Sequence, residues 1–311
     1  MVGFCEIFSM ITPRFIFPIA LSLAWAPFAD AMIASVNGEV TYNTTATGDV
    51  SEIWNRTVKL VGGTGTYLGQ SADGTHWVMT AAHVTAGNGT IVTSTGETIG
   101  LTAAPEQKVL FYNADGTKAD LQLFAVSAAN AEAESYLNAL GNIKIYEGDL
   151  YKNTPLYCVG TGCNLSIGSG ISGDSTRVKQ WGEFCADGLT PEPVAASGFK
   201  THALIETFSV AGNSIQCGMY DSGSGVFVNN GGTWEAVGVA ITVGAANEGA
   251  SKVGYKDAQG ENKLENPVCY TMFTDLSAYA SQIYAVIPEP SLFGLMAGVF
   301  ALGLAGVRRR R

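Results

Sequence analysis

Short strand-like segments separated by glycine-rich turns recur through most of this chain, and they constrain its fold more than any other feature. Residues 57–61 alternate between apolar and polar side chains, as a half-buried strand does, and Gly-Gly-Thr-Gly at 62–65 indicates a turn. Residues 119–126 are largely apolar, which is typical of a buried strand. Further strand-like segments cover 66–68, 76–80, 156–159, 203–209, 224–228, 234–243 and 268–273. This spacing predicts an all-β fold of barrels or a sandwich.

Two segments depart from the strand pattern. The composition of 127–140 favours a helix, or a linker between two halves, and the composition of 275–284 predicts a helix at the end of the folded region. The chain has 311 residues, 47% of them hydrophobic, and shows no internal repeat. It is therefore long enough for one large domain or two small ones.

The N-terminal residues have the order of a secretory signal. Arg14 precedes an apolar run from Phe15 to Phe28, and Ala29-Asp30-Ala31 follows with small residues around a cleavage point. We therefore predict a signal peptide over 1–31, cleaved after Ala31. The alternative is a buried core helix. Initiation at Met10 instead of Met1 would give a signal of more ordinary length.

The C-terminal residues join a proline-rich motif to an apolar segment and a basic tail. Val286-Ile-Pro-Glu-Pro290 is followed by 17 uncharged residues up to Val307 and then by four arginines. As a helix this segment would span about 25 Å, just enough for a bilayer core. The combination resembles the PEP-CTERM sorting signal of Gram-negative bacteria. That resemblance implies export, recognition by an exosortase at the inner membrane, and delivery to the cell surface or its extracellular matrix. The alternative is a plain membrane anchor.

Charge and cysteine content narrow the possible partners. With 17 basic and 27 acidic side chains, the net charge is −10, which argues against nucleic acid as a partner. Without a Cys-x-x-Cys pair, and with three histidines, the sequence predicts no metal site, and we expect no cofactor. In an oxidising compartment, the cysteines beyond the signal favour disulfides, and the sequence leaves their pairing open. These five cysteines are Cys158, Cys163, Cys185, Cys217 and Cys269.

A serine in a tight polar turn is the first candidate for chemistry. Ser222 lies in the segment 217–228, between an aspartate and a glycine, and directly before an apolar strand. A serine needs a base to become nucleophilic, and the base needs an acid that fixes its tautomer. His83 follows an apolar strand and two alanines, and Asp120 lies at the start of a buried strand. Each feature alone has an ordinary structural explanation, as a turn, a strand-end histidine or a cap.

Together the three segments resemble the trypsin-like serine proteases of the chymotrypsin clan. They read Thr-Ala-Ala-His83, Asp120-Leu-Gln-Leu and Asp-Ser222-Gly-Ser-Gly, separated by 37 and 102 residues. The resemblance extends to the segments 74–84, 234–239 and 270–279, and it covers about 50–285. It implies two antiparallel six-stranded β-barrels with a short C-terminal helix, with barrel one at about 50–130 and barrel two at about 141–285. An N-terminal segment over 32–49 would precede them, and the sorting signal over 286–311 would follow.

The resemblance also implies roles for individual residues. Ser222 would be the nucleophile, His83 the general base and then acid, and Asp120 the orienting carboxylate. The backbone N–H groups of Tyr220 and Ser222 would form the oxyanion hole. Asp115 is the rival for the acid and Ser224 the rival nucleophile. The partner of Asp221, which in the family is a new N-terminus, stays open because no Ile-Val-Gly-Gly activation site is present.

Two departures from the family pattern bear on activity. Tyr220 replaces a glycine, and its Cβ disfavours the backbone conformation that aims one oxyanion donor. Cys217 lies one residue further from Ser222 than in the family, which puts Ile215 or Gln216 at the base of the substrate pocket and favours a neutral or apolar side chain there. A bridge between Cys217 and Cys269 is a further hypothesis.

The sequence therefore predicts an exported serine endopeptidase that acts on polypeptides. The alternative is a catalytically impaired protease homologue that acts as a binding protein at the cell surface or in its matrix. The partners expected are a polypeptide substrate, a sorting enzyme of the exosortase type, and the inner membrane until the C-terminal segment is processed. A surface protein with coincidental motifs is the third reading.

Overall fold

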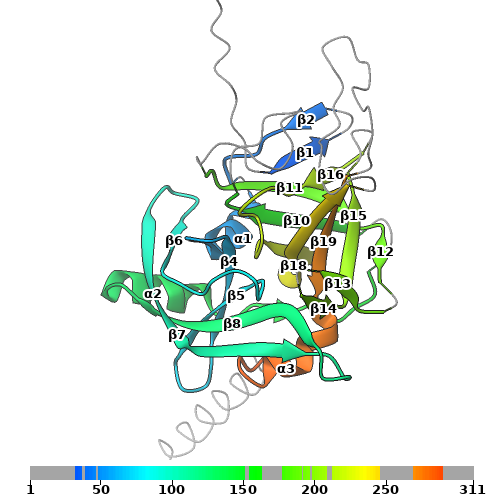
Figure 1. Ribbon diagram of the computed structural model, residues 1–311. Helices are drawn as coiled ribbons and strands as arrows, with labels where there is room; N and C mark the ends of the chain where they lie inside the picture. Colours follow the sequence, from blue (N-terminus) through cyan, green and yellow to red (C-terminus); the bar gives the residue numbers. More distant parts are fainter. Residues whose placement is uncertain are drawn as a thin grey trace, which may run out of the picture.

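The structure is a computed structural model that describes residues 32–36, 39–46, 48–150, 154–162, 177–190, 192–196, 198–208, 212–245 and 269–289. Two β-structures lie side by side, one built from the first half of these residues and one from the second (Figure 1). The predicted signal peptide and the sorting segment beyond residue 289 lie outside the described residues. Within the described part of the chain, no helix is long and apolar enough to cross a membrane.

The first half is a closed antiparallel barrel of six strands in the order β3-β4-β5-β8-β7-β6. The strands are β3 (Thr57–Leu60), β4 (Thr64–Gln70), β5 (His76–Thr80), β6 (Gly89–Val92), β7 (Thr98–Tyr112) and β8 (Lys118–Ala128). As the apolar run predicts, β8 is buried from Ala119 to Val126. The pairing of β5 with β8 places Thr80 opposite Gln122, so the end of β5 lies beside the start of β8.

The second half is an open sheet within the described residues. Its order is β11-β10-β17-β18-β19-β15-β12, with β9 parallel to β18. The strands are β9 (Lys144–Ile145), β10 (Pro155–Gly160), β11 (Gln180–Cys185), β12 (Gly188–Leu189), β15 (Ala203–Thr207), β17 (Gly225–Asn230), β18 (Thr233–Ala245) and β19 (Cys269–Asp275). A hairpin of β13 (Val194–Ala196) and β14 (Phe199–Thr201) stands apart. The all-β fold with two barrel halves is confirmed, although this half is not a closed six-stranded barrel.

A small third sheet packs on the second half. It has the order β16-β1-β2, from β16 (Ser214–Gln216), β1 (Ile33–Val36) and β2 (Glu39–Thr41). Its strands contact β11, the edge strand at one end of the open sheet, and β15 near the other end. Met32, Ala34 and Ile215 join Phe184 and Leu204 in one apolar cluster, so this sheet covers the second core.

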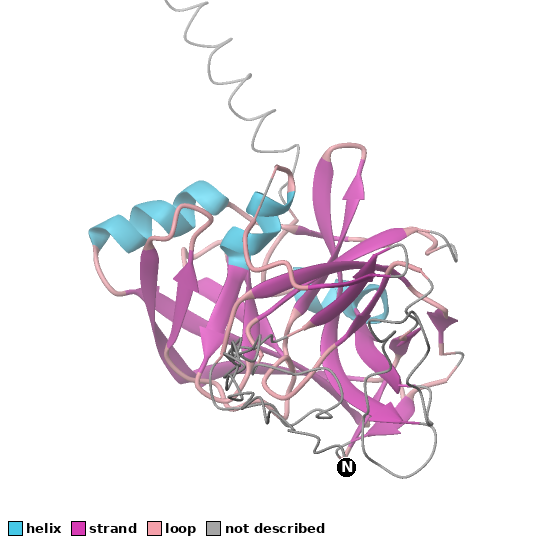
Figure 2. Ribbon diagram, turned by 90° about the horizontal axis from the view of Figure 1, so that it is seen from above, coloured by secondary structure: helices cyan, strands magenta, loops and turns pink. Residues whose placement is uncertain are grey.

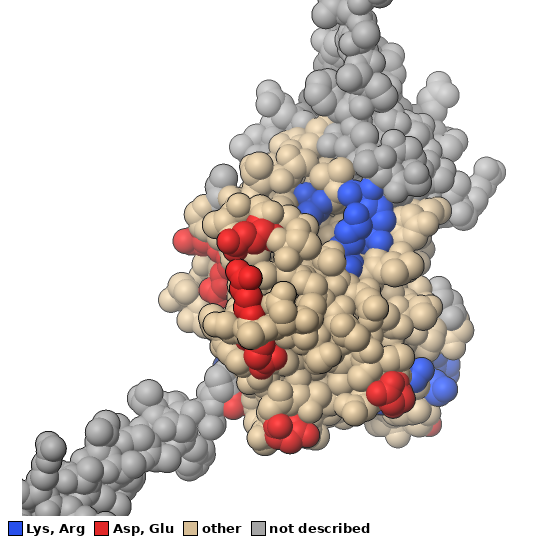
Figure 3. Space-filling view, turned by 90° about the vertical axis from the view of Figure 1, so that its left-hand side faces the viewer, with Lys and Arg blue, Asp and Glu red and all other residues tan. Residues whose placement is uncertain are grey.

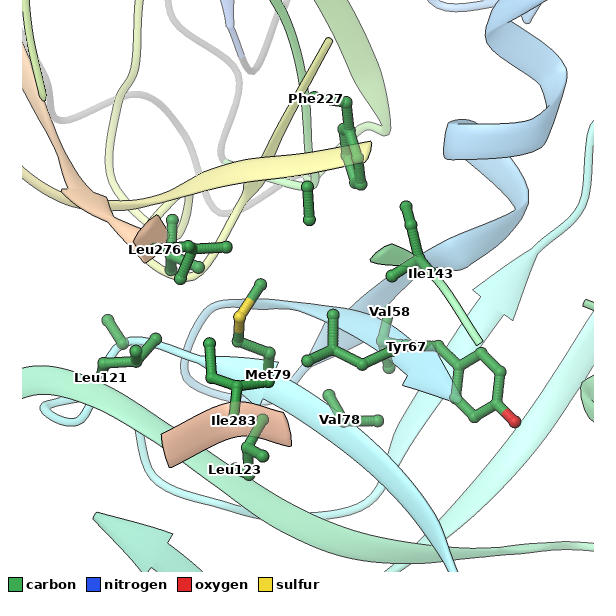
Figure 4. Close-up of a cluster of buried hydrophobic side chains, with 14 of the residues drawn as sticks. Val58, Tyr67, Val78, Met79, Leu121, Leu123, Ile143, Phe227, Leu276 and Ile283 are labelled. Atoms are coloured by element: carbon green, nitrogen blue, oxygen red, sulfur yellow. The ribbon is translucent and has the colours of Figure 1, made fainter. Parts of the chain in front are cut away.

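The main apolar core is shared between the halves. It contains Val58, Val78 and Leu123 of the barrel together with Phe227 and Leu276 of the second half. Figure 4 shows these side chains converging from both sides, with the Tyr67 hydroxyl pointing out of the cluster. Because one core spans both halves, the seam between them is fixed by apolar burial.

Helices lie mainly at the ends of the β-structures. They are α1 (Val50–Arg56), α2 (Ala131–Leu140), the 3₁₀ helix η1 (Leu276–Tyr279) and α3 (Ala280–Tyr284). The predicted helix within 127–140 is confirmed as α2, which lies along the outside of the barrel (Figure 2). Asn130 caps it, because its side chain accepts a hydrogen bond from the N–H of Ala133.

The surface carries few charges, since 14% of all residues are Asp, Glu, Lys or Arg. On the face shown in Figure 3, acidic side chains line the left side, basic side chains gather near the top, and one acidic and one basic group lie next to each other at the lower right. The acidic excess of the chain therefore appears on this face as separate patches.

Candidate active site

His83 and Asp120 form a hydrogen-bonded pair at the edge of the barrel. His83 follows β5, and Asp120 lies near the start of β8. Nδ1 of His83 lies 2.7 Å from Oδ2 of Asp120, and the backbone N–H of His83 donates to Oδ1 at 3.0 Å. Because an ionised carboxylate only accepts hydrogen bonds, Nδ1 carries a proton and Nε2 keeps a free lone pair.

The two partners differ in exposure. The Asp120 side chain is 1% exposed, whereas the His83 side chain is 30% exposed. The backbone of Asp120 is held by Thr201, whose Oγ1 accepts its N–H at 2.8 Å, and by Thr274, whose hydroxyl donates to its C=O at 3.3 Å. The carboxylate is therefore fixed inside the protein, while the imidazole reaches solvent and could exchange a proton with a bound molecule.

Gln122 holds the turn that carries His83. Its side-chain amide donates to the backbone C=O groups of Ala81 and Val84, at 3.1 and 2.5 Å. Gln122 is itself buried in β8, two residues from Asp120. One strand therefore supplies both the carboxylate that meets the imidazole and the amide that fixes its backbone. The sequence did not single out Gln122.

Ser222 lies on a loop that is bonded directly to the barrel. Its C=O accepts a hydrogen bond from the N–H of Thr64 at 2.8 Å. Gly223 follows with φ of +90°, and a Cβ there would lie 1.8 Å from the Thr64 carbonyl oxygen. Only glycine fits this position, because both the backbone angle and the close approach exclude a side chain.

The loops of Ser222 and His83 meet at Gly63. A Cβ on Gly63 would lie 2.7 Å from the C=O oxygen of Ser222 and 2.9 Å from Val84, the residue after His83. Both loops therefore pack on the same backbone position. Among the described residues, no hydrogen bond joins the Ser222 hydroxyl to His83. Such contacts are often long in a protein without substrate.

The two rival residues lie in unsuitable places. Ser224 is fully buried and its hydroxyl has no hydrogen-bond partner, whereas Ser222 is partly exposed. Asp115 lies in an exposed turn, where its carboxylate accepts hydrogen bonds from the N–H and hydroxyl of Thr117. The geometry thus favours Ser222 as the accessible hydroxyl and Asp120 as the acid beside His83. Their catalytic roles stay predictions.

Asp221 is bound by backbone amides. It is fully buried, and its carboxylate accepts hydrogen bonds from the N–H of Gly162 at 2.8 Å and of Gly218 at 2.9 Å. Burial raises the pKa of Asp221 to about 7, although the two N–H donors and the nearby Arg177 charge act in the opposite direction. Residues 160–162 approach so closely that a Cβ on Gly162 would lie 2.5 Å from this carboxylate. The partner that the sequence left open is therefore, among the described residues, a pair of amides.

Tyr220 adopts the backbone conformation that a glycine would take. Its φ is +70°, and it is the one non-glycine residue with positive φ among the described residues. Such a conformation costs on the order of 1–3 kcal/mol for a residue with a Cβ. Its C=O accepts a hydrogen bond from Thr64 Oγ1 at 2.9 Å, which fixes the peptide that follows. Within the described part of the chain, the N–H groups of Tyr220 and Ser222 meet no backbone acceptor.

The region next to the predicted pocket base is buried and partly polar. Ile215 and Gln216 are both fully buried, and Oε1 of Gln216 has no hydrogen-bond partner. Cys217 and Cys158 are both buried, free thiols. The predicted Cys217–Cys269 bridge is therefore wrong for this structure, because Cys217 is a free thiol. The side chain of Cys269 lies outside the described residues.

The described residues thus form a closed six-stranded antiparallel barrel beside a second, open β half, with the candidate side chains along their seam. Among solved structures, the chain is similar to one described as the structure of a Glu endopeptidase in complex with MPD. The TM-score is 0.44 and the identity 12%, over 82% of this chain and 96% of the other. No protein-family model and no curated protein matches the sequence. Residue assignments must therefore rest on the geometry of this chain.

Proposed function

We propose that this chain is a serine endopeptidase whose catalytic residues are Ser222, His83 and Asp120. The observation that supports it most is the His83–Asp120 pair, with a buried carboxylate, an exposed imidazole and an accessible serine on the adjoining loop. A polypeptide is the substrate class that this chemistry serves. The proposed protease domain covers 50–285.

The proposed mechanism follows from the proton positions. With Nδ1–H donated to Asp120, Nε2 of His83 accepts the proton of the Ser222 hydroxyl as its oxygen attacks the substrate carbonyl. The protonated imidazole is stabilised by the Asp120 carboxylate and then gives its proton to the leaving amine. An acyl group remains on Ser222. Water, activated by the same imidazole, releases it.

The backbone N–H groups of Tyr220 and Ser222 supply the proposed oxyanion hole. Neither meets a backbone acceptor among the described residues, and both belong to the loop that carries the nucleophile. Donors already directed at the developing oxyanion need no reorganisation during the reaction. The positive φ of Tyr220 supports this assignment, because it is the conformation that a glycine at this position would adopt.

Covalent labelling tests the proposal. A fluorophosphonate probe phosphonylates only a serine that a neighbouring base activates. We expect the mature, folded protein to be labelled at Ser222, and labelling to be lost in Ser222→Ala and His83→Ala. Ser224→Ala is the matched control, because its buried hydroxyl cannot reach a probe. No labelling of the folded wild-type protein would disprove the hydrolase assignment.

A catalytically impaired homologue that binds polypeptides at the cell surface is the second candidate. The observation that favours it is the strain at Tyr220, which glycine would avoid. Tyr220→Gly separates the candidates in a peptidase assay. A large gain in activity over a weak wild type indicates an impaired enzyme, whereas no turnover in either form favours a binding protein.

Export and sorting are proposed from the sequence. We propose cleavage after Ala31, passage to the cell surface or matrix of a Gram-negative bacterium, and a transient anchor in the inner membrane. An exosortase-type enzyme would process the segment from 286 onwards. Mass spectrometry of the protein recovered from the cell surface tests both ends. An intact C-terminal arginine tail on the surface protein would contradict processing.

A further inference from the structure

Arg177 lies at the junction of the barrel, the second half and the serine loop. Its guanidinium donates to the C=O of Thr161 at 2.7 Å and to the Thr161 hydroxyl at 2.8 Å. It also donates to the C=O groups of Leu60 and Gly63 in the turn between β3 and β4. One side chain therefore ties the end of β10 to the barrel turn on which the loops of His83 and Ser222 meet.

The same guanidinium lies over the ring of Tyr220. Its Cζ is 4.9 Å from the ring centroid, within the range of a cation–π contact. Arginine is suited to this arrangement because its planar group stacks on a ring and still donates at its edge. This contact holds the ring of the Tyr220 side chain in place.

A second chain of contacts fixes the Tyr220 backbone. The Thr64 hydroxyl donates to the C=O of Tyr220 at 2.9 Å, and it lies 2.8 Å from the Thr161 hydroxyl that Arg177 contacts. The N–H of Thr161 points at the same Thr64 oxygen, at 3.1 Å. Ring and carbonyl of Tyr220 are thus held by one network that passes through Arg177.

This network explains how a tyrosine persists in a left-handed conformation. Strained conformations persist only when the surroundings over-determine them. We propose that Arg177 is a positioning residue that holds Tyr220 at positive φ and thereby keeps its N–H available to the oxyanion. The catalytic consequence rests on the proposed function, but the conformational one does not.

Glycine at 220 is the decisive background, because glycine reaches positive φ without help. Arg177→Lys keeps the positive charge but loses the planar fork. We expect this change to lower kcat about 10- to 100-fold, with KM within about threefold, since losing an oxyanion donor costs about 100- to 1000-fold. In Tyr220→Gly, the same change should alter kcat less than about threefold. An equal loss in both backgrounds, or no loss in either, would overturn the proposal.

Lys179 provides a matched control. It lies two residues away, its Nζ is 4.8 Å from the Trp54 ring centroid, and it donates to the C=O groups of Trp54, Thr57 and Val92. It is therefore a partly buried basic side chain over an aromatic ring, and none of its contacts involves the serine loop. Lys179→Gln should lower stability and leave kcat within about threefold. A loss of kcat like that of Arg177→Lys would show a general effect of changing a basic side chain at this junction.

A readout that is independent of turnover separates this proposal from the proposed function. The full mature chain, labelled with ¹⁵N-tyrosine and ¹⁵N-serine, gives amide signals that Tyr220→Gly and Ser222→Ala assign. We expect Arg177→Lys to move the Tyr220 and Ser222 signals, and Lys179→Gln to leave them in place. If the wild type and Tyr220→Gly both lack activity, the proposed function fails while these shifts still decide the role of Arg177. If the Tyr220 and Ser222 signals do not move in Arg177→Lys, Arg177 does not position Tyr220.

Discussion

Two histidine–carboxylate pairs flank the same strand of the barrel, and their burial is opposite. His83 pairs with Asp120 just beyond the end of β5, where the imidazole is 30% and the carboxylate 1% exposed. His76, the first residue of β5, lies 3.0 Å from Glu134 of α2, where the imidazole is 4% and the carboxylate 46% exposed. The chemical groups are the same. What differs is which of them the protein encloses.

This difference in burial decides whether the imidazole has a nitrogen available to react. In the second pair, Nδ1 of His76 lies 2.7 Å from the Tyr67 hydroxyl, and Nε2 contacts both Glu134 and Gln70. No nitrogen is left for a substrate. In the first pair, the buried carboxylate uses only Nδ1, so Nε2 stays available. Burial of the acid suits a catalytic base, whereas burial of the imidazole suits a structural link between α2 and the barrel.

The largest effect expected is on activity. His83→Ala should lower kcat by about 10⁴-fold or more, and Asp120→Asn by about 10⁴-fold, because the base or its tautomer is lost. His76→Ala should change kcat less than about threefold under conditions where the protein is folded. Steady-state hydrolysis of a peptide substrate measures all three. Equal losses at His76 and His83 would remove the distinction between the pairs.

A third carboxyl group, which is buried, sharpens the comparison, because no ion pair holds it within the described residues. Glu206 on β15 is 1% exposed, and its Oε1 accepts hydrogen bonds from the Ser214 hydroxyl and from the N–H of Ile215. Its Oε2 has no partner. Asp120 is buried as deeply but meets an imidazole N–H. Burial raises the pKa of Glu206 to about 8, although the hydrogen bonds from Ser214 and Ile215 act in the opposite direction.

This raised pKa predicts that stability falls as the pH rises from about 4.5 to about 8. The native state keeps the Glu206 proton between its ordinary pKa near 4.5 and about 8, where the unfolded chain has lost it. Stability is therefore highest below this window and falls as the pH rises through it. We expect Glu206→Gln to match the wild type near pH 5 and to exceed it by on the order of 3 kcal/mol near pH 9. Urea unfolding at both pH values measures this. A constant difference between the proteins would show that Glu206 does not titrate.

Local patterns in the sequence predicted much of the first half of the fold. Alternation marked β3, the largely apolar run marked β8, and composition marked the helix α2. Closure of the second half was not predictable in this way. It depends on which strand edges meet, and the strands beside the second half include a sheet that pairs Ile33 with Gln216. Contacts between residues so distant in the chain leave no periodic signal.

The candidate site shows the same division. His83, Asp120 and Ser222 follow from short motifs, because each motif records a local requirement of the chemistry. The residues that hold them were missed. Arg177 reaches Leu60 across 117 positions, and Gln122 reaches Ala81 across 41. The sequence pointed to the backbone strain at Tyr220 but not to its surroundings, since its carbonyl accepts from Thr64 and its ring lies under the Arg177 guanidinium.

The smallest effect expected distinguishes the two members of the His76 pair. His76→Ala removes a buried ring and leaves the Tyr67 hydroxyl with one partner, the Leu137 carbonyl, so we expect a loss of about 2 kcal/mol in the free energy of unfolding. Glu134→Ala removes an exposed partner and should cost less than about 1 kcal/mol, because solvent screens it.

The pH dependence of Glu134→Ala completes this test. The hydrogen bond from His76 lowers the pKa of Glu134 below its ordinary value near 4.5. The carboxylate therefore adds stability above that value, and its contribution disappears as the pH falls through the lowered pKa. Urea unfolding should thus show the difference between wild type and Glu134→Ala shrinking towards zero in acid, while the His76→Ala deficit persists, because most of it comes from lost packing around a buried side chain. If Glu134→Ala costs as much as His76→Ala at neutral pH, the exposed carboxylate matters as much as the enclosed ring, and burial no longer distinguishes this pair from His83 and Asp120.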